Sequence, residues 1–286
     1  MNADPAIKTV DNRTSKAAFF GFCIRVQRLL KFDAETTRIL DIAYQGADIT
    51  RRRRASFDAI RPSGGDAILD LGCGNGLLTA ELARAVGHSG RVIGVDPSAD
   101  MLKSARERCR EFDWVAFRDG AANPLPVDSA SIDKAVSLQV FEYLDDLPAA
   151  SAELFRALRP GGIVAIGDMH FDTLVWHSDD TARMADMIAS WDHHLVERCV
   201  PAILPPVLRN AGFVVDEVVA LPFTDHILRP DGLANVMLHL MQAYAVQNEH
   251  MSAVDAAAWA QEQHELAAQG RFFFSLTHFV VIARKP

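Results

Sequence analysis

Hydrophobic positions in the middle of the chain alternate between short apolar runs and helical spacing. Runs such as Ala67–Leu71 and Ile132–Leu138 are bounded by turn-forming residues, which indicates buried strands. The segment Leu77–Val86 between them repeats its apolar residues at the helical period. Strands that alternate with helices are typical of a largely parallel sheet covered on both faces. The pattern therefore predicts a doubly wound α/β fold.

Short apolar runs and helical spacing also predict the remaining strands and helices. Strands are expected over Ala67–Leu71, Arg91–Val95, Val115–Arg118, Ile132–Leu138, Gly162–Gly167, Val214–Leu221 and Phe272–Ala283. Helices are expected over Leu77–Val86, Ala99–Arg110, Leu147–Leu158, parts of 178–211, Leu233–Gln247 and Val254–Gln269.

Breaks in these patterns suggest how the chain is organised. Apolar residues recur at helical spacing from Ala17 to Ile60, and a Pro- and Gly-rich stretch ends them. We expect residues 1–62 to form a helical segment that packs on a main domain, 63–286. Helical insertions at about 172–200 and 231–270 begin where the strands end. Long connections of this kind are usually functional, so we expect a substrate lid.

Composition narrows the classes of partner. Apolar residues make up 49% of the chain, as in ordinary globular proteins, and the net charge of −8 argues against nucleic-acid binding. The basic run Arg51–Arg54 is expected to be a solvated helix face. No membrane partner is expected, because no apolar run approaches a membrane span. The absence of a signal-peptide pattern predicts a cytoplasmic protein. The cysteines lack metal-ligand spacing, so no metal site is expected (Cys23, Cys73, Cys109 and Cys199).

The densest motif is the glycine-rich stretch that follows the first strand. Asp70, Gly72, Gly74 and Gly76 form the pattern D-x-G-x-G-x-G. Glycines at a strand-to-helix turn allow positive φ angles and let a ligand approach the backbone. The dinucleotide pattern G-x-G-x-x-G would need a glycine at Leu77, so this turn departs from it.

This motif resembles the first motif of the class I S-adenosylmethionine (SAM)-dependent methyltransferases, in particular small-molecule enzymes of the type 11 group. Asp96, Asp119-Gly120 and Arg159–Gly162 follow in the family's order. The resemblance is close over 67–167 and looser over 214–283. It implies a Rossmann-like seven-stranded sheet, mostly parallel with the last strand antiparallel. It also implies SAM as the cofactor and S-adenosylhomocysteine as the product.

The resemblance assigns roles by position. Asp70 is expected near the methionine ammonium, Asp96 at the ribose hydroxyls and Gln139 near the sulfonium. The full set of expected cofactor residues is Tyr44, Asp70, Gly72, Cys73, Gly74, Gly76, Asp96, Pro97, Met101, Asp119, Gly120 and Gln139.

The strand ends also suggest where the acceptor lies. Aromatic side chains such as Tyr143, Phe171 and Trp176 gather there, which favours an apolar or aromatic small molecule. Methyl transfer is an in-line displacement that positioning can catalyse, and a hydroxyl acceptor gains from a base. His170 is the first candidate for that base and His226 the second. Monomer and homodimer both remain open.

Three other functions stay open at this point. Arsenite methylation needs several convergent thiolates, which the cysteine pattern does not indicate. A nicotinamide-dependent oxidoreductase is disfavoured by Leu77 and by the additional Gly76. A SAM-binding protein without catalysis would carry the same cofactor motif.

Overall fold

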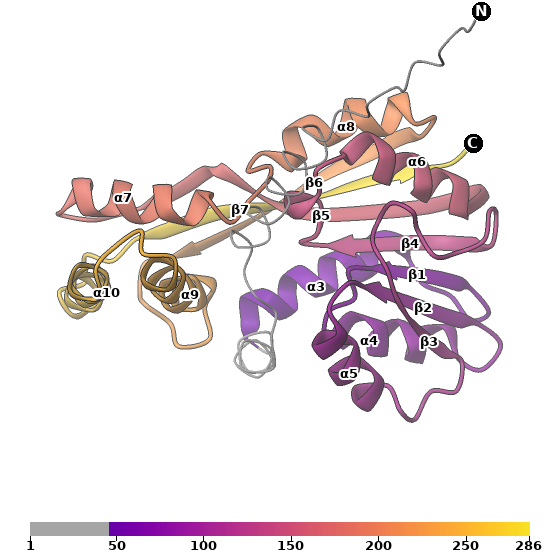
Figure 1. Cartoon of the computed structure of the whole chain (residues 1–286), viewed down its shortest axis with the longest axis horizontal. Coiled ribbons are helices and arrows are strands. Elements are labelled where there is room, and N and C mark those ends of the chain that lie inside the picture. Colours follow the sequence, from indigo (N-terminus) through magenta and orange to yellow (C-terminus); the bar gives the residue numbers. More distant parts are fainter. Residues whose placement is uncertain (1–45) are drawn as a thin grey trace, which may run out of the picture.

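The computed structural model describes residues 46–286 of the chain, and within them one seven-stranded sheet forms the centre of the fold (Figure 1). The strand order is β3-β2-β1-β4-β5-β7-β6. The strands are β1 (Ala67–Leu71), β2 (Arg91–Asp96), β3 (Val115–Asp119), β4 (Ile132–Leu138), β5 (Leu158–Trp176), β6 (Val214–Asp225) and β7 (Phe274–Arg284). Strands β1 to β5 pair in parallel, and β7 lies antiparallel between β5 and β6. The predicted fold class is confirmed.

Helices cover both faces of this sheet. The helices are α3 (Ala47–Ile60), α4 (Leu77–Val86), α5 (Ala99–Arg108), α6 (Leu147–Ala157), α7 (Thr181–Asp192), α8 (Val200–Asn210), α9 (Leu233–Gln247) and α10 (Ala253–Ala268). Helices α3, α4 and α5 pack on one face, and α6 and α8 pack on the other. A short 3-10 helix, η1 (Phe141–Tyr143), follows β4. The helical segment was predicted over residues 1–62. The structure describes it from residue 46 onward, and this part contains α3.

Local capping explains where several helices begin. Ser98 precedes α5, and its Oγ accepts a hydrogen bond from the Met101 N–H at 3.3 Å. Asp146 caps α6 in the same way, accepting from the Ala149 N–H at 2.8 Å. Each cap satisfies a backbone donor that the first helical turn leaves unpaired. The polar residues before these helices therefore fix the loops at the carboxyl ends of β2 and β4.

Two strands are longer than the sequence pattern predicted. β5 was expected to end at Gly167 and continues to Trp176, and β6 continues from Leu221 to Asp225. Both extensions pair with β7, and the register of β5 on β7 shifts between His170 and Val175. This irregularity is a large bulge, because residues 171–174 have no partner on β7 and pairing resumes at Val175. Backbone pairing with β7 sustains the strands beyond the point where their apolar run stops.

Beyond the bulge, the strand extensions and three helices form a second cluster, here called the distal lobe. It contains α7, α9, α10 and the ends of β5, β6 and β7 (left side of Figure 1). The Trp176 ring packs edge-on against Trp259 and Phe274, with centroids 5.4 and 4.9 Å apart. Trp176 Nε1 also donates to Gln263 Oε1 at 2.9 Å. The two helical insertions predicted from the sequence thus share one aromatic core.

We predict that this lobe depends on Trp259, whose side chain is fully buried. Trp259→Ala should lower the free energy of unfolding by about 3–5 kcal/mol, because a large buried aromatic leaves a cavity. Val254→Ala on the same helix, at a residue that is 78% exposed, should change it by no more than about 0.5 kcal/mol. Chemical denaturation followed by tryptophan fluorescence and far-UV circular dichroism measures both. Equal losses in the two variants would contradict the packing described here.

Candidate functional site

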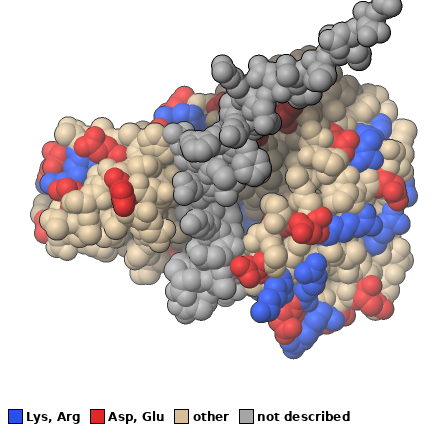
Figure 2. Space-filling model, viewed as in Figure 1, with Lys and Arg blue, Asp and Glu red and all other residues tan. Residues whose placement is uncertain are grey.

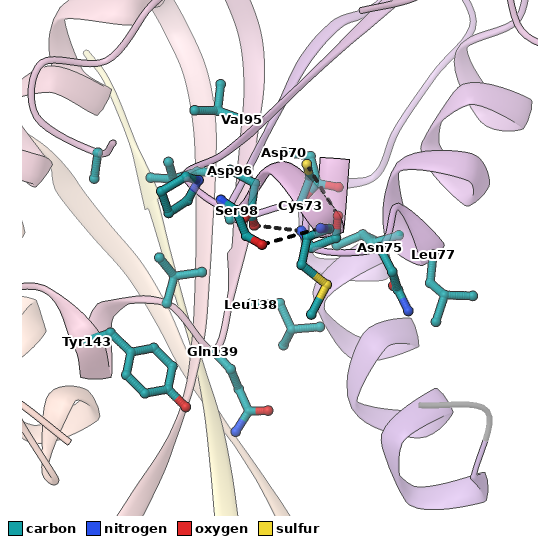
Figure 3. A pocket seen from close by; sticks show the side chains of 18 of the residues that line it. Asp70, Cys73, Asn75, Leu77, Val95, Asp96, Ser98, Leu138, Gln139 and Tyr143 are labelled. Carbon is teal, nitrogen blue, oxygen red and sulfur yellow. Dashed lines mark hydrogen bonds between the residues drawn. The ribbon is translucent and has the colours of Figure 1, made fainter. Parts of the chain in front are cut away.

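A cavity of about 350 Å³ opens at the carboxyl ends of β1, β2 and β4. Its wall includes the turn after β1, the turn after β2 and the segment after β4 (Figure 3). Ligands of doubly wound sheets bind at this edge, where the strand order reverses. The volume falls within the range of about 300–1,000 Å³ that small-molecule sites occupy.

The glycine turn forms the floor of this cavity. Gly72 has φ +70°, and a Cβ there would lie 2.1 Å from Val140 Cγ2, so the turn and the segment after β4 touch. Gly74 has φ +52°, and a Cβ there would meet no heavy atom within 4 Å. The backbone at Gly74 therefore faces open space within the cavity. Glycine at Gly72 permits close packing, while glycine at Gly74 leaves room for a ligand.

One carboxylate ties two of these turns together. Asp96 Oδ2 accepts the Gly74 N–H at 2.9 Å, and Asp96 Oδ1 accepts the Ser98 N–H at 2.9 Å. Asp96 is buried and lines the cavity beside Ser98 (Figure 3). Burial raises the pKa of Asp96, while the hydrogen bonds from Ser98 and Gly74 oppose that rise. Each carboxylate oxygen retains acceptor capacity, so Asp96 can bind a pair of hydroxyls in the cavity.

Asp70 is the second acidic residue of the cavity wall. Its carboxylate is buried and accepts the Thr79 hydroxyl at 2.6 Å on Oδ2. Burial raises the pKa of Asp70 to about 7, and the Thr79 hydrogen bond opposes this shift. A cationic group bound in the cavity would stabilise the ionised form. Asp70 is therefore suited to recognise an ammonium group.

Gln139 and Tyr143 lie on the side of the cavity away from Asp96 and Ser98 (Figure 3). Gln139 has φ +54°, an uncommon conformation for a residue other than glycine, and its N–H donates to the Gly167 carbonyl at 2.7 Å. Tyr143 belongs to η1 and its ring lies 5.9 Å from the His194 ring. This left-handed residue and the short helix turn the chain so that both side chains face the cavity.

The structure brings most of the predicted cofactor residues to one cavity. The predicted residues that line it are Asp70, Gly72, Cys73, Gly74, Asp96, Pro97, Met101, Gly120 and Gln139. Gly76 is not in the wall. It precedes α4 and packs against Ala105 of α5. Asp119 is exposed at the end of β3, beside Gly120. Tyr44 lies outside the described residues. The contacts of these residues with a cofactor stay a prediction.

The expectation of a solvated face at Arg51–Arg54 is wrong for two of the four side chains. Arg52 and Arg53 are buried and line the cavity. Arg53 Nε donates to Glu81 Oε1 at 2.7 Å. A helix packed along the sheet turns two consecutive positions inward, while Arg51 and Arg54 remain exposed. Charge alone suggested a solvent-facing run, but the helical period of α3 decides which arginines are buried.

A buried acid pair beside the cavity was not predicted. Glu142 in η1 and Asp168 in β5 are each 1% exposed, and the Glu142 N–H donates to Asp168 Oδ1 at 3.4 Å. Burial raises the pKa of both carboxyls. The nearby charge of Arg52 opposes the rise for both, and Glu142 raises the pKa of Asp168 further. Glu142 Oε2 and Asp168 Oδ2 have no hydrogen-bond partner among the described residues. Glu142 follows the strand predicted over Ile132–Leu138 and Asp168 follows the strand predicted over Gly162–Gly167, and these positions were the available sequence signal.

Neither candidate histidine is among the described residues that line the cavity. His170 lies at the β5 bulge, half-buried, with its ring centroid 6.0 Å from that of Phe279. His226 follows β6 and is exposed. The wall likewise contains no residue of α7, α9 or α10. The catalytic roles of the histidines and the lid role of the insertions stay predictions.

The surface and the helices give two further observations. Acidic and basic side chains are interspersed on the face shown in Figure 2. Among residues 46–286, every helix is too short or too polar to cross a bilayer.

Comparisons with known proteins agree with this geometry. Residues 69–166 match the methyltransferase domain family. The chain is 33% identical over 175 residues to the 2-phytyl-1,4-naphthoquinone methyltransferase of Thermosynechococcus vestitus, covering 56% of this chain and 78% of that enzyme. It is 32% identical over 235 residues to a 37.1 kDa protein in transposon TN4556 of Streptomyces fradiae, covering 80% and 65% of the two chains. The chain spans about half to two thirds of the length of its first curated matches.

Solved structures show the same fold. Geranyl diphosphate C-methyltransferase from Streptomyces coelicolor, solved in complex with S-adenosylhomocysteine, superimposes with a TM-score of 0.51. The two share 19% identity, and the alignment covers 83% of this chain and 76% of that one. The chain belongs to the class I SAM-dependent methyltransferases. The cavity fits SAM, because it combines an open backbone at Gly74 with carboxylates suited to hydroxyls and to an ammonium group.

The raised pKa of Asp70 predicts a pH-dependent stability. A carboxyl whose folded-state pKa lies above its unfolded value stabilises the fold at low pH, and this contribution is lost as pH rises through about 7. Between pH 5 and 7 the wild type should therefore lose stability relative to Asp70→Asn, by at most about 1.4 kcal/mol per pH unit and by less as the pH nears 7. Urea unfolding of both proteins at several pH values tests this. A difference that is constant with pH would contradict it.

Proposed function

We propose that this protein transfers a methyl group from SAM to a small organic acceptor. The observation that carries the proposal is the arrangement of Asp96 and the glycine turn. A ribose-sized group fits beside the open Gly74 backbone, where Asp96 can accept its hydroxyls. SAM would supply an electrophilic methyl group on its sulfonium. The family membership and the cavity support this activity together.

The chain's own residues then have distinct tasks. Asp70 pairs with the methionine ammonium, and Met101 packs beside the adenine. Gln139 and Tyr143 lie on the side from which an acceptor would approach (Figure 3). The left-handed backbone at Gln139 and the short helix η1, which contains Tyr143, set the positions of these two residues, and this favours catalysis by proximity and alignment.

Aromatic side chains near Tyr143 support an apolar or aromatic acceptor. The His194 ring lies 5.9 Å from Tyr143, 3.8 Å from Trp191 and 5.6 Å from Tyr244. These contacts connect the cavity wall to the core of the distal lobe. Burial lowers the pKa of His194 to about 4, so its ring is neutral at physiological pH. The cavity wall at Tyr143 is therefore backed by a buried, neutral aromatic core, and this favours an apolar acceptor over a charged one.

The first test is cofactor recognition. The purified protein should bind S-adenosylhomocysteine and show no comparable affinity for NADH, as measured by isothermal titration calorimetry. Asp96→Asn should weaken S-adenosylhomocysteine binding by about 10–100-fold, because charge-assisted hydrogen bonds to the ribose are weakened. Asp100→Asn is the matched control, since Asp100 is exposed in the first turn of the adjoining helix α5 and should leave the affinity unchanged.

Tight NADH binding without a response to S-adenosylhomocysteine would support the nicotinamide-dependent alternative and overturn the proposal. Binding of S-adenosylhomocysteine without methyl transfer to any phenol, quinol or amine offered would favour the non-catalytic alternative. Arsenite methylation needs several convergent thiolates. Among the described residues, the one group of three potential metal ligands contains a single thiol, Cys199, so it gives this alternative no support.

A hydroxyl acceptor also needs a group that takes its proton, and two candidates can be separated. His170 is the candidate favoured by the sequence. The alternative is the buried pair Glu142 and Asp168 beside Tyr143, where burial raises the pKa of Glu142 to about 7 and also raises the pKa of Asp168. Loss of the base should lower turnover by about 10²–10⁴-fold and leave the dissociation constant of S-adenosylhomocysteine unchanged. His170→Gln and Glu142→Gln, measured over pH 5–9, are the informative variants.

A large loss in His170→Gln alone would assign the base to His170. A large loss in Glu142→Gln alone, with the pH dependence of turnover abolished, would assign it to the acid pair. His226→Gln belongs in the same series as the second histidine candidate. Full activity in all three variants would contradict base catalysis by these residues and leave positioning as the source of the rate.

A further inference from the structure

Three side chains that are typical metal ligands converge outside the cavity. The imidazole of His170, the carboxylate of Asp172 and the thiol of Cys199 each offer a ligand atom, and these atoms lie within 4.8 Å of one another. Cys199 Sγ is 3.0 Å from Asp172 Oδ2. His170 and Asp172 lie at the β5 bulge, and Cys199 is the residue that precedes α8. Their separation in sequence is the reason that ligand spacing did not reveal the group.

Backbone contacts hold the two segments in place. The Phe171 N–H, between the two β5 ligands, donates to the Arg198 carbonyl at 3.0 Å. The Thr173 hydroxyl donates to the His170 carbonyl at 2.7 Å and accepts the Thr277 N–H at 3.0 Å. The Cys199 N–H donates to Glu197 Oε1 at 2.7 Å. These hydrogen bonds hold the β5 bulge, which contains His170 and Asp172, and the start of α8, where Cys199 lies.

We propose that His170, Asp172 and Cys199 form a site for a zinc-like divalent cation. Imidazole, thiolate and carboxylate together are the donor set that zinc prefers, and three protein ligands leave a fourth position for water or another ligand. His170 Nδ1 is buried and has no hydrogen-bond partner among the described residues, so one donor nitrogen is available. The cysteine and histidine distinguish this group from an ordinary surface cluster of acids.

The charges around the site are compatible with a cation. Arg198 Nε lies 3.1 Å from Asp172 Oδ1, which leaves Oδ2 facing the thiol. Arg198 Nη1 is also paired with Asp192 Oδ2 at 2.6 Å, so its charge is shared between two carboxylates. Glu197 adds a further negative charge beside Cys199. Arg198 thus resembles an outer-shell partner that orients a ligating carboxylate.

Binding requires the thiol to lose its proton. Burial and the nearby Asp172 raise the pKa of Cys199 to about 11, so the metal-free thiol is protonated and donates to Asp172. The cation would take the place of that proton between Sγ and Oδ2, and the proton would pass to solvent. Because the thiolate and not the thiol ligates a metal, affinity should increase with pH.

Cobalt(II) is a suitable probe, because thiolate ligation produces a charge-transfer band in the near ultraviolet. The full-length protein should bind one Co²⁺ with that band, and Zn²⁺ should displace it. Cys199→Ser should abolish the band, while His170→Gln and Asp172→Asn should each weaken binding by about 10-fold or more. His177→Gln is the matched control. His177 also lies beside an aspartate, with 3.9 Å between His177 Nε2 and Asp179 Oδ1, but it is not part of the proposed site. This variant should bind Co²⁺ normally.

Absence of the band in the wild type would overturn the proposal. The same band in Cys199→Ser would also overturn it, because the thiolate would then come from another cysteine. Circular dichroism confirms that each variant is folded before titration. The measurement needs neither SAM nor an acceptor, so its result is independent of the proposed methyl transfer.

Discussion

The hydrogen bonds of Asp96 are the interaction on which the cavity depends. A single carboxylate accepts from Gly74 in the turn after β1 and from Ser98 at the start of α5. The Gly72 and Cys73 N–H groups also donate to the Val95 carbonyl, at 2.7 and 3.0 Å, so the carboxylate adds to the backbone bonds between the turn after β1 and the end of β2. Gly72 completes the arrangement by its close contact with Val140, which belongs to the segment after β4. These contacts between adjacent strand ends hold together the three segments that form the cavity wall, namely the turn after β1, the turn after β2 and the segment after β4.

The distal lobe is connected to this site by continuous strands and by ion pairs. β5 and β7 pass from the core beneath the cavity into the lobe without an intervening loop. Arg229 Nη2 pairs with Asp48 at 2.6 Å, and Arg229 Nε pairs with Asp225 at 2.6 Å. Asp48 Oδ2 also accepts the Leu233 N–H at 2.8 Å. The start of α3, the end of β6 and the start of α9 are held together at this junction.

The strand and helix positions up to β4 were predictable from the sequence because their apolar runs are short and bounded by turn residues. The extension of β5 was missed, since its apolar run stops at Gly167 and polar residues follow. Asp168, His170 and Asp172 nevertheless alternate with Met169 and Phe171, and this period of two is a strand signal.

Most residues that the sequence singled out for the cofactor line one cavity, because they come from one continuous motif and from the ends of successive strands. The acid pair, the buried arginines of α3 and the His170–Asp172–Cys199 group were not predictable from the sequence. Each of these depends on which side chains the folded chain brings together across elements. The paired carboxylates Glu142 and Asp168, for example, are buried because η1 and β5 pack against each other. A single sequence shows no period or spacing that encodes such a contact.

The position of β7 has a consequence for how the chain assembles. β7 lies between β5 and β6 although it follows both in sequence, so these two strands do not pair with each other. During synthesis, β6 has no strand partner and β5 keeps an unpaired edge until residues 274–284 leave the ribosome. The five parallel strands can form earlier. The part of the fold that contains β1 to β4 is therefore expected to fold during synthesis, whereas the distal lobe can form only after β7 is available.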